Sequence, residues 1–135
     1  MGVSEFRYRR RVQFAETDLM GVVHFSWITR YMEEAEHALW REAGLSIAPK
    51  GAKVLFPRVA LSIDFKAPLA FEDECEVLVR VDTMSARTIR YAHTITCGGV
   101  TIATGTMTAA CVVNAAPPLR SAEIPAEIRT ALGQR

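Results

Sequence analysis

The longest helical pattern in the chain covers residues 26–43 and supplies a single apolar stripe. Its apolar residues recur every three or four positions, as on one face of an amphipathic helix; they are Ile28, Tyr31, Met32, Ala35, Ala38 and Leu39. The opposite face carries Arg30, Glu33, Glu34, Glu36, His37 and Arg41, and Arg30 and Glu34 stand one turn apart as an expected surface pair. Ser26 is placed to cap the start of the helix, and Gly44 to end it in a left-handed conformation.

Five stretches of alternating or β-branched residues predict strands. In the first, residues 6–14, basic side chains alternate with apolar ones, which predicts a cationic face; the others are residues 54–66, 74–83, 88–97 and 101–113. Pro57 indicates that its strand starts late or lies at a sheet edge, because proline has no N–H to donate. Residues 84–87 and the pair Gly98–Gly99 are expected to connect the last three strands as hairpins.

This order of elements predicts a single α+β domain over residues 1–135. A strand, one long helix and four further strands suggest one antiparallel five-stranded sheet wrapped around one central helix. Pro125 is expected at the first position of a short C-terminal helix. One helix leaves the other face of the sheet bare, so we expect that face to pack against another subunit.

The composition of the chain argues against nucleic acid and membranes as binding partners. Half of the 135 residues are hydrophobic and the formal net charge is +1, so no basic stripe indicates nucleic acid. No apolar run is long enough to span a bilayer, and no secretory leader pattern is seen, so we expect a cytoplasmic protein without a membrane partner. The cysteines, Cys75, Cys97 and Cys111, are odd in number and lack metal-ligand spacing, which favours reduced, buried thiols.

The loop before the long helix holds the candidate chemistry. Asp18 precedes a helix N-terminus, where free N–H groups suit a developing oxyanion. A carboxylate beside it can attack a carbonyl directly or remove a proton from water. From spacing alone, Asp18 is more simply a turn or capping residue.

The segment containing Asp18 resembles a known family. The run VQFAETDLMGVVHFSWITRYMEEAE is similar to the signature of the 4-hydroxybenzoyl-CoA thioesterase family of hotdog folds, and FPRVALSIDFKAPLAFEDECEVLVRV resembles its following strands. The resemblance implies hydrolysis of acyl-CoA thioesters without metal or organic cofactor, in homodimers or homotetramers with sites between subunits. It assigns the catalytic carboxylate to Asp18 and the carbonyl donor to the backbone N–H of Phe25.

The resemblance also shows departures that bear on the substrate. One branch of the family has a histidine where this chain has Phe25; here the histidine is His24, one residue earlier. Trp27 and Ile28 stand where the family usually has a small polar residue and then an aromatic, so the acyl pocket is expected to differ.

The remaining candidate residues each have a structural alternative. Gly21, Val23, His24, Ser26 and Trp27 are candidates for lining the substrate site. His24 orients water or substrate, or else fills the turn. Ser26 is more simply a cap than a nucleophile, because no base is placed to activate it.

Basic residues are expected at the mouth of a coenzyme A site. The candidates for its phosphates are Arg58, Arg87 and Arg90, each of which is otherwise an ordinary surface charge. Glu33 either reaches a partner's site or is a solvated helix residue. Glu16 and Thr17 are expected to be structural.

Three further functions fit the same pattern. A hydratase or dehydratase would use Asp18 with His24 and release no thiol. A non-catalytic acyl-CoA binding module would bind without turnover. A thioesterase acting on acyl carrier protein would prefer the carrier-linked acyl group in a salt-dependent way.

Overall fold

The computed structural model describes residues 2–134 and contains one long helix, a five-stranded sheet and several short elements. In chain order these are β1 (Glu5–Arg11), η1 (Phe14–Glu16), α1 (Phe25–Glu42), β2 (Val54–Leu55), β3 (Arg58–Phe65), β4 (Glu74–Met84), β5 (Thr88–Cys97), β6 (Val100–Ala110), β7 (Val112–Val113) and α2 (Ala126–Ala131).

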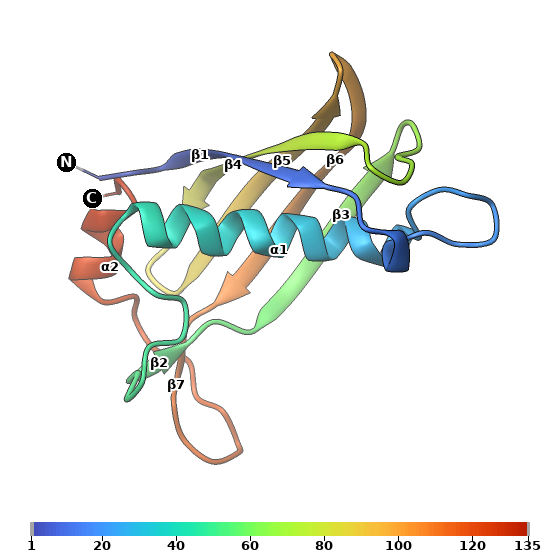
Figure 1. The fold of residues 1–135 in the computed structure, drawn as a ribbon. Helices are drawn as coiled ribbons and strands as arrows, with labels where there is room; N and C mark the ends of the chain where they lie inside the picture. Colours follow the sequence, from blue (N-terminus) through green and yellow to red (C-terminus); the bar gives the residue numbers. More distant parts are fainter. Residues whose placement is uncertain (1, 135) are drawn as a thin grey trace.

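The main sheet has the order β1-β4-β5-β6-β3, and every neighbouring pair is antiparallel. It curves behind α1, which crosses it from end to end, while α2 lies near the two chain termini (Figure 1). The predicted five-stranded antiparallel sheet around one long helix, with a short C-terminal helix, is confirmed. Strands β2 and β7 pair with each other as a separate two-stranded ribbon.

The core lies between α1 and the concave face of the sheet. All six residues of the predicted apolar stripe are buried. Glu36, which was assigned to the polar face, is also buried, so that assignment was wrong. Glu36 stands four residues after Met32, and this spacing places it on the buried side of the helix. The predicted Arg30–Glu34 pair is also wrong, since Glu34 binds Arg10 instead.

Several predicted boundaries shift where local geometry competes with the alternating pattern. The first strand ends at Arg11, because residues 14–16 turn into a short 3-10 helix. Pro57 separates β2 from β3, and β3 lies at the sheet edge, where a missing donor costs no ladder bond. Pro125 is the N-cap of α2 and not its first residue. Gly44 follows α1 with φ of 81°, as predicted.

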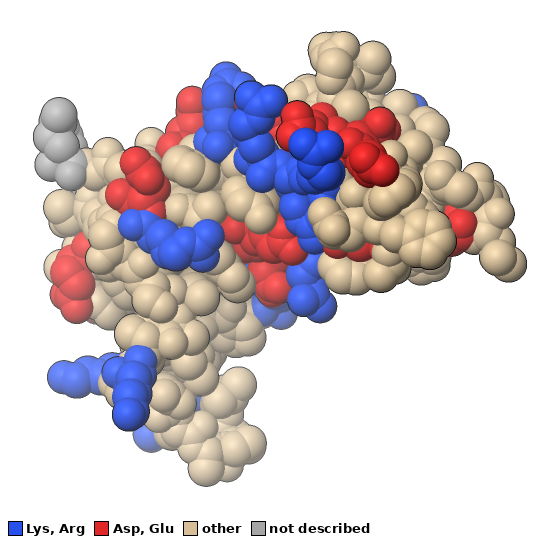
Figure 2. All heavy atoms as spheres, in the orientation of Figure 1, with Lys and Arg blue, Asp and Glu red and all other residues tan. Residues whose placement is uncertain are grey.

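Charged side chains of both signs are interleaved over the face formed by α1 and β1 (Figure 2). Several are ion-paired between strands, including Arg7 with Glu76 and Arg11 with Glu74. Within residues 2–134, no helix is both long and apolar enough to cross a membrane.

Candidate active site

The Asp18 loop is a tight turn folded back against the start of α1. The Asp18 N–H donates to the carbonyl of Val22 at 2.9 Å, and Thr17 forms an antiparallel bridge with Val23. Gly21 allows the reversal with φ of 81°, a conformation that costs glycine little. Its N–H donates to the Asp18 carbonyl at 3.0 Å. The turn therefore places Thr17 and Asp18 beside Val22 and Val23, which lead into α1.

The Asp18 carboxylate is partly exposed, and only one of its two oxygens accepts a hydrogen bond. One oxygen, Oδ1, accepts from the Met20 N–H at 2.8 Å, which is an Asx turn. The other oxygen has no hydrogen-bond partner among residues 2–134. The structural reading of Asp18 as a turn residue is thus correct, and it leaves one carboxylate oxygen available for chemistry.

The start of α1 presents a backbone donor beside this loop. Phe25 is the first residue of the helix, and within the described residues its N–H donates to no acceptor. An eighteen-residue helix adds a partial positive charge at this end. The arrangement thus offers a donor and a positive field to an oxyanion.

His24, and not Ser26, caps the helix. The Nδ1 atom of His24 accepts from the Ser26 N–H at 3.3 Å and lies 2.8 Å from the Ser26 hydroxyl. Ser26 is therefore inside the first turn, and its predicted role as N-cap was wrong. The His24 ring lies against the Phe25 ring, with centroids 4.5 Å apart.

The other loop candidates have mixed exposure. Val23 is buried and its N–H donates to the carbonyl of Leu69, so its side chain belongs to the core. Trp27 is partly buried, with the Arg30 guanidinium 5.7 Å from its ring centroid. Phe25 is 65% exposed and meets Phe65 of β3 edge to face, with centroids 6.4 Å apart. Two exposed aromatic rings therefore lie together at the start of α1.

A groove lies between α1 and strands β3 and β6. Its cavity is about 270 Å³ and is lined by Ser26, Thr29, Arg30, Glu33, Arg58, Leu61 and Met107. The helix side of the groove is polar, and the strand side combines the apolar Leu61 and Met107 with the charged Arg58.

Arg58 is held inside the subunit. Its guanidinium donates to both carboxylate oxygens of buried Glu36 and lies 3.9 Å from the carboxylate of Glu33. Burial raises the pKa of Glu36, and the charge and hydrogen bonds of Arg58 oppose that rise. Arg58 therefore compensates a buried charge, a role that the sequence pattern did not indicate.

Arg87 and Arg90 lie away from Asp18 in the same chain. Arg87, at the β4–β5 turn, donates to the Ser121 hydroxyl at 3.0 Å. The same turn accepts a bond from Arg129 of α2, at the end of the molecule opposite the start of α1 (Figure 1). Arg90 faces Asp82 at 3.6 Å, at the surface. The structure does not bring these two arginines together with Asp18 within one subunit.

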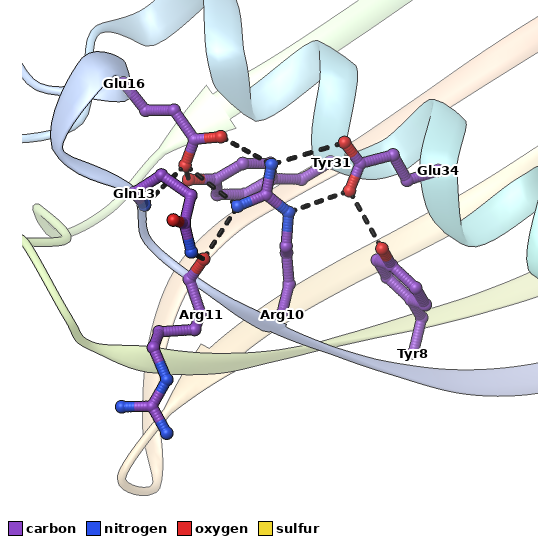
Figure 3. A network of polar contacts seen from close by, with 7 residues as sticks. All are labelled: Tyr8, Arg10, Arg11, Gln13, Glu16, Tyr31 and Glu34. Atoms are coloured by element: carbon purple, nitrogen blue, oxygen red, sulfur yellow. Dashed lines mark hydrogen bonds and ion pairs between the residues drawn. The ribbon is translucent and has the colours of Figure 1, made fainter.

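A polar network centred on buried Glu16 joins β1, the turn after it and α1 (Figure 3). Glu16, 3% exposed, accepts two hydrogen bonds from Arg10 and one each from the Gln13 N–H and the Tyr31 hydroxyl. Burial alone would raise the pKa of Glu16, but the bonds from Arg10, Gln13 and Tyr31 outweigh it, and the pKa lies below its ordinary value. Glu16 was expected to be structural, and its side chain is indeed buried and faces away from solvent. Its partners were missed, although Arg10 shares the inner face of β1 with Phe6 and Tyr8.

The three cysteine thiols are free, as expected. Cys75 and Cys111 are buried, while Cys97 is only partly so. Burial raises the pKa of Cys75 to about 11, which disfavours the thiolate. Among residues 2–134, no three His, Cys, Asp or Glu side chains gather as a metal site would require.

Comparisons with known proteins find thioesterases that are similar to this chain. The family model described as "Thioesterase-like superfamily" matches residues 12–132. A 1,4-dihydroxy-2-naphthoyl-CoA hydrolase from Synechococcus is 28% identical over 120 residues, covering 84% of this chain and 90% of that protein.

Two solved structures have the same fold over nearly the whole chain. A 1,4-dihydroxy-2-naphthoyl-CoA thioesterase from Synechocystis gives a TM-score of 0.87 at 26% identity, covering 95% of each chain. A gentisyl-coenzyme A thioesterase gives a TM-score of 0.80 at 27% identity, covering 92% of this chain and 99% of that one.

Proposed function

Since this chain belongs to the thioesterase-like superfamily of hotdog-fold enzymes, we propose that this thioesterase hydrolyses acyl-CoA thioesters to a free acid and coenzyme A. The observation that carries the proposal is that one acceptor and one donor at the two ends of the same loop have no hydrogen-bond partner among residues 2–134. Asp18 has a carboxylate oxygen without a partner, and the Phe25 N–H at the start of α1 has no acceptor among residues 2–134. A thioester carbonyl placed between them is attacked from one side and polarised from the other.

The reaction follows from these two groups. The thioester oxygen accepts from the Phe25 N–H, and the positive end of α1 stabilises the charge that develops on it. Asp18 either bonds to the carbonyl carbon, forming an anhydride that water cleaves, or takes a proton from the attacking water. In both routes the C–S bond breaks and the thiol of coenzyme A leaves. No cofactor takes part in either route.

We propose hydroxyarenoyl groups as the acyl class. Two relatives with similar sequence and fold are named for dihydroxynaphthoyl-CoA and gentisyl-CoA, both of which carry hydroxylated aromatic rings. The exposed rings of Phe25 and Phe65 offer an aromatic surface beside the proposed oxyanion donor. The adjacent groove adds hydroxyl and charged groups that suit ring hydroxyls.

We propose that the active unit is a homodimer or homotetramer. The edge strand β3 has a free side in the single chain, and its Val59, Leu61 and Phe65 are at least half exposed. A second copy placed there covers this apolar strip and closes the groove between α1 and β3. The positions of Arg87 and Arg90 fit this proposal, because arginines remote from their own Asp18 are free to serve a site formed with another copy.

The test is release of free thiol from a panel of CoA esters by wild type and Asp18→Asn. The panel contains 1,4-dihydroxy-2-naphthoyl-CoA, gentisyl-CoA, 4-hydroxybenzoyl-CoA, hexanoyl-CoA and palmitoyl-CoA. We expect wild type to prefer the aromatic esters, and kcat to fall by about 100-fold to 10,000-fold in Asp18→Asn, the contribution usual for a positioned acid or base. Circular dichroism checks that the variant is folded.

Other outcomes separate the competing functions. Equal turnover by both proteins would show that Asp18 is not catalytic. Turnover only of carrier-linked esters would identify an acyl-carrier-protein thioesterase. Binding without turnover would identify a binding module, and hydration of an enoyl-CoA without thiol release a hydratase.

A further inference from the structure

Glu16 stands two residues before Asp18 and is hydrogen-bonded to His24 and Tyr31 at the start of α1. We propose that Glu16, clamped by Arg10, is a positioning residue that fixes the carboxylate of Asp18 relative to the Phe25 amide. This inference rests on the proposed function, because it assigns a purpose to the placement of those two groups. Glu16 itself is buried and does not face the groove.

The side chain of Glu16 ties three elements together (Figure 3). Arg10 on β1 donates to its two oxygens at 2.9 and 2.5 Å. Tyr31, on the second turn of α1 and fully buried, donates to it at 2.5 Å, and the Gln13 N–H donates at 2.8 Å. Bidentate and charge-assisted bonds of this kind hold both partners in one geometry. The carboxylate is thus fixed to the sheet edge, to the helix and to its own turn.

The main chain of Glu16 carries this restraint to both catalytic groups. Its carbonyl accepts from the N–H of His24, the helix cap, at 2.9 Å. The amide of Phe25 directly follows that of His24, and Asp18 follows Glu16 by two residues. A shift of Glu16 therefore moves the carboxylate and the oxyanion donor relative to each other. Such misplacement lowers the rate of reaction more than the affinity for substrate.

The charges of the network make this role testable. Arg10 faces two carboxylates, since it also donates to Glu34 at 2.9 Å, and Glu34 accepts from Tyr8 at 2.9 Å. Glu16→Gln leaves Arg10 and Glu34 as a neutral pair, so no buried charge is stranded. The amide keeps one oxygen for Tyr31 and Gln13 but turns its NH₂ group toward the guanidinium, which breaks the clamp. Replacing Arg10 would instead leave two neighbouring carboxylates uncompensated, and such a variant is expected to misfold.

The experiment measures kcat and KM for 1,4-dihydroxy-2-naphthoyl-CoA, per folded enzyme, in wild type, Glu16→Gln and Asp18→Asn. We expect kcat of Glu16→Gln to fall by about tenfold to 100-fold, as for a modest displacement of reacting groups, with KM unchanged. The matched control is Glu76→Gln, which breaks the exposed pair between Arg7 and Glu76 on the neighbouring strands and should leave kcat at the wild-type value.

A milder variant keeps the test decisive if Glu16→Gln does not fold. Tyr31→Phe deletes one hydrogen bond to Glu16 with little change of shape, and we expect kcat to fall by about threefold to tenfold, the effect of one such bond. A purely structural role would lower the melting temperature and the folded fraction but leave kcat of the folded enzyme intact. That result, with Asp18→Asn inactive, overturns the positioning role alone. Full activity of Asp18→Asn overturns the proposed function instead.

Discussion

At the scale of single residues, the conformation around Phe25 allows its N–H to be removed without breaking the helix. Phe25 is the first residue of α1, where proline is well tolerated because its missing N–H has no helical partner. His24 already has φ of −63° and ψ of 137°, the extended conformation that a residue before proline needs. The backbone donor can therefore be tested separately from the ring.

Phe25→Pro is expected to fold as wild type does and to lose about 100-fold to 1,000-fold in kcat, the usual effect of deleting one oxyanion donor. Phe25→Leu is the control, because it removes the exposed ring and keeps the N–H. Thiol release and the melting temperature check both variants. Equal kcat in the two variants would show that this amide does not bind the carbonyl oxygen.

His93 is a second residue with a testable role, because its buried surroundings make the free energy of unfolding depend on pH. It is buried on β5, and within the described residues neither ring nitrogen has a hydrogen-bond partner. Burial, and after it the charge of Arg58, lowers the pKa of His93 from 6.5 to about 4. Between those two pH values the unfolded chain binds a proton that the folded chain does not, so the free energy of unfolding falls as the pH falls.

We expect wild type to lose up to about 3 kcal/mol from this residue between pH 6.5 and pH 4. His93→Leu should flatten that part of the pH dependence, because leucine fills a similar volume and takes up no proton. Urea unfolding across this pH range measures the slope. An unchanged slope in His93→Leu would show that His93 is not its cause.

At the scale of elements, the contact between α1 and the sheet depends on a small residue in β6. Gly105 lies opposite α1, where an added Cβ would come within 2.8 Å of the Ser62 carbonyl and 3.2 Å of the Met32 side chain. The first of these neighbours is backbone of the edge strand and cannot move alone. The space that a side chain would need here is taken by Met32 of α1 and by the backbone of β3.

Gly105→Ala is therefore expected to lower the free energy of unfolding by about 1–3 kcal/mol, as overpacking of a core usually does. Thr104→Ala is the control, since its side chain lies on the opposite face of the same strand. Urea unfolding measures both. A Gly105→Ala protein as stable as wild type would show that β3 or α1 yields to the extra methyl group.

At the scale of the whole molecule, the strip along β3 is the apolar surface that a second copy is proposed to cover. Leu61 is 50% exposed at the middle of β3, and Phe65 is 54% exposed at its end. Leu61→Arg places a charge in this strip and should convert an oligomeric protein to monomers in sedimentation velocity. Val100→Arg, at the β5–β6 turn and also half exposed, should leave the mass unchanged. A wild-type monomer would contradict the proposal directly.

Periodicity in the sequence was sufficient to predict α1, the five strands of the main sheet and the class of fold, but not η1 or the β2–β7 ribbon. The helical spacing from Ile28 to Leu39 and the alternation in β5 each admit one way of burying their apolar side chains. The helix stop at Gly44 needs a positive φ that glycine readily adopts, so it too was predicted from local chemistry. The acidic loop before the helix was recognisable because Asp18 and Gly21 are neighbours along the chain.

The pairing of charges was decided only by the tertiary structure. Arg10 with Glu16 and Glu34, and Arg58 with Glu36, join residues from different elements, and their partners depend on how strands and helix pack. The same holds for Arg87, whose distance from Asp18 is set by the path of the sheet. The sequence by itself determined which residues form the long helix, the strands of the main sheet and the acidic loop around Asp18, because those depend on local spacing. The fold decided which charges are buried together, because an electrostatic interaction depends on distance in space and not on distance along the chain.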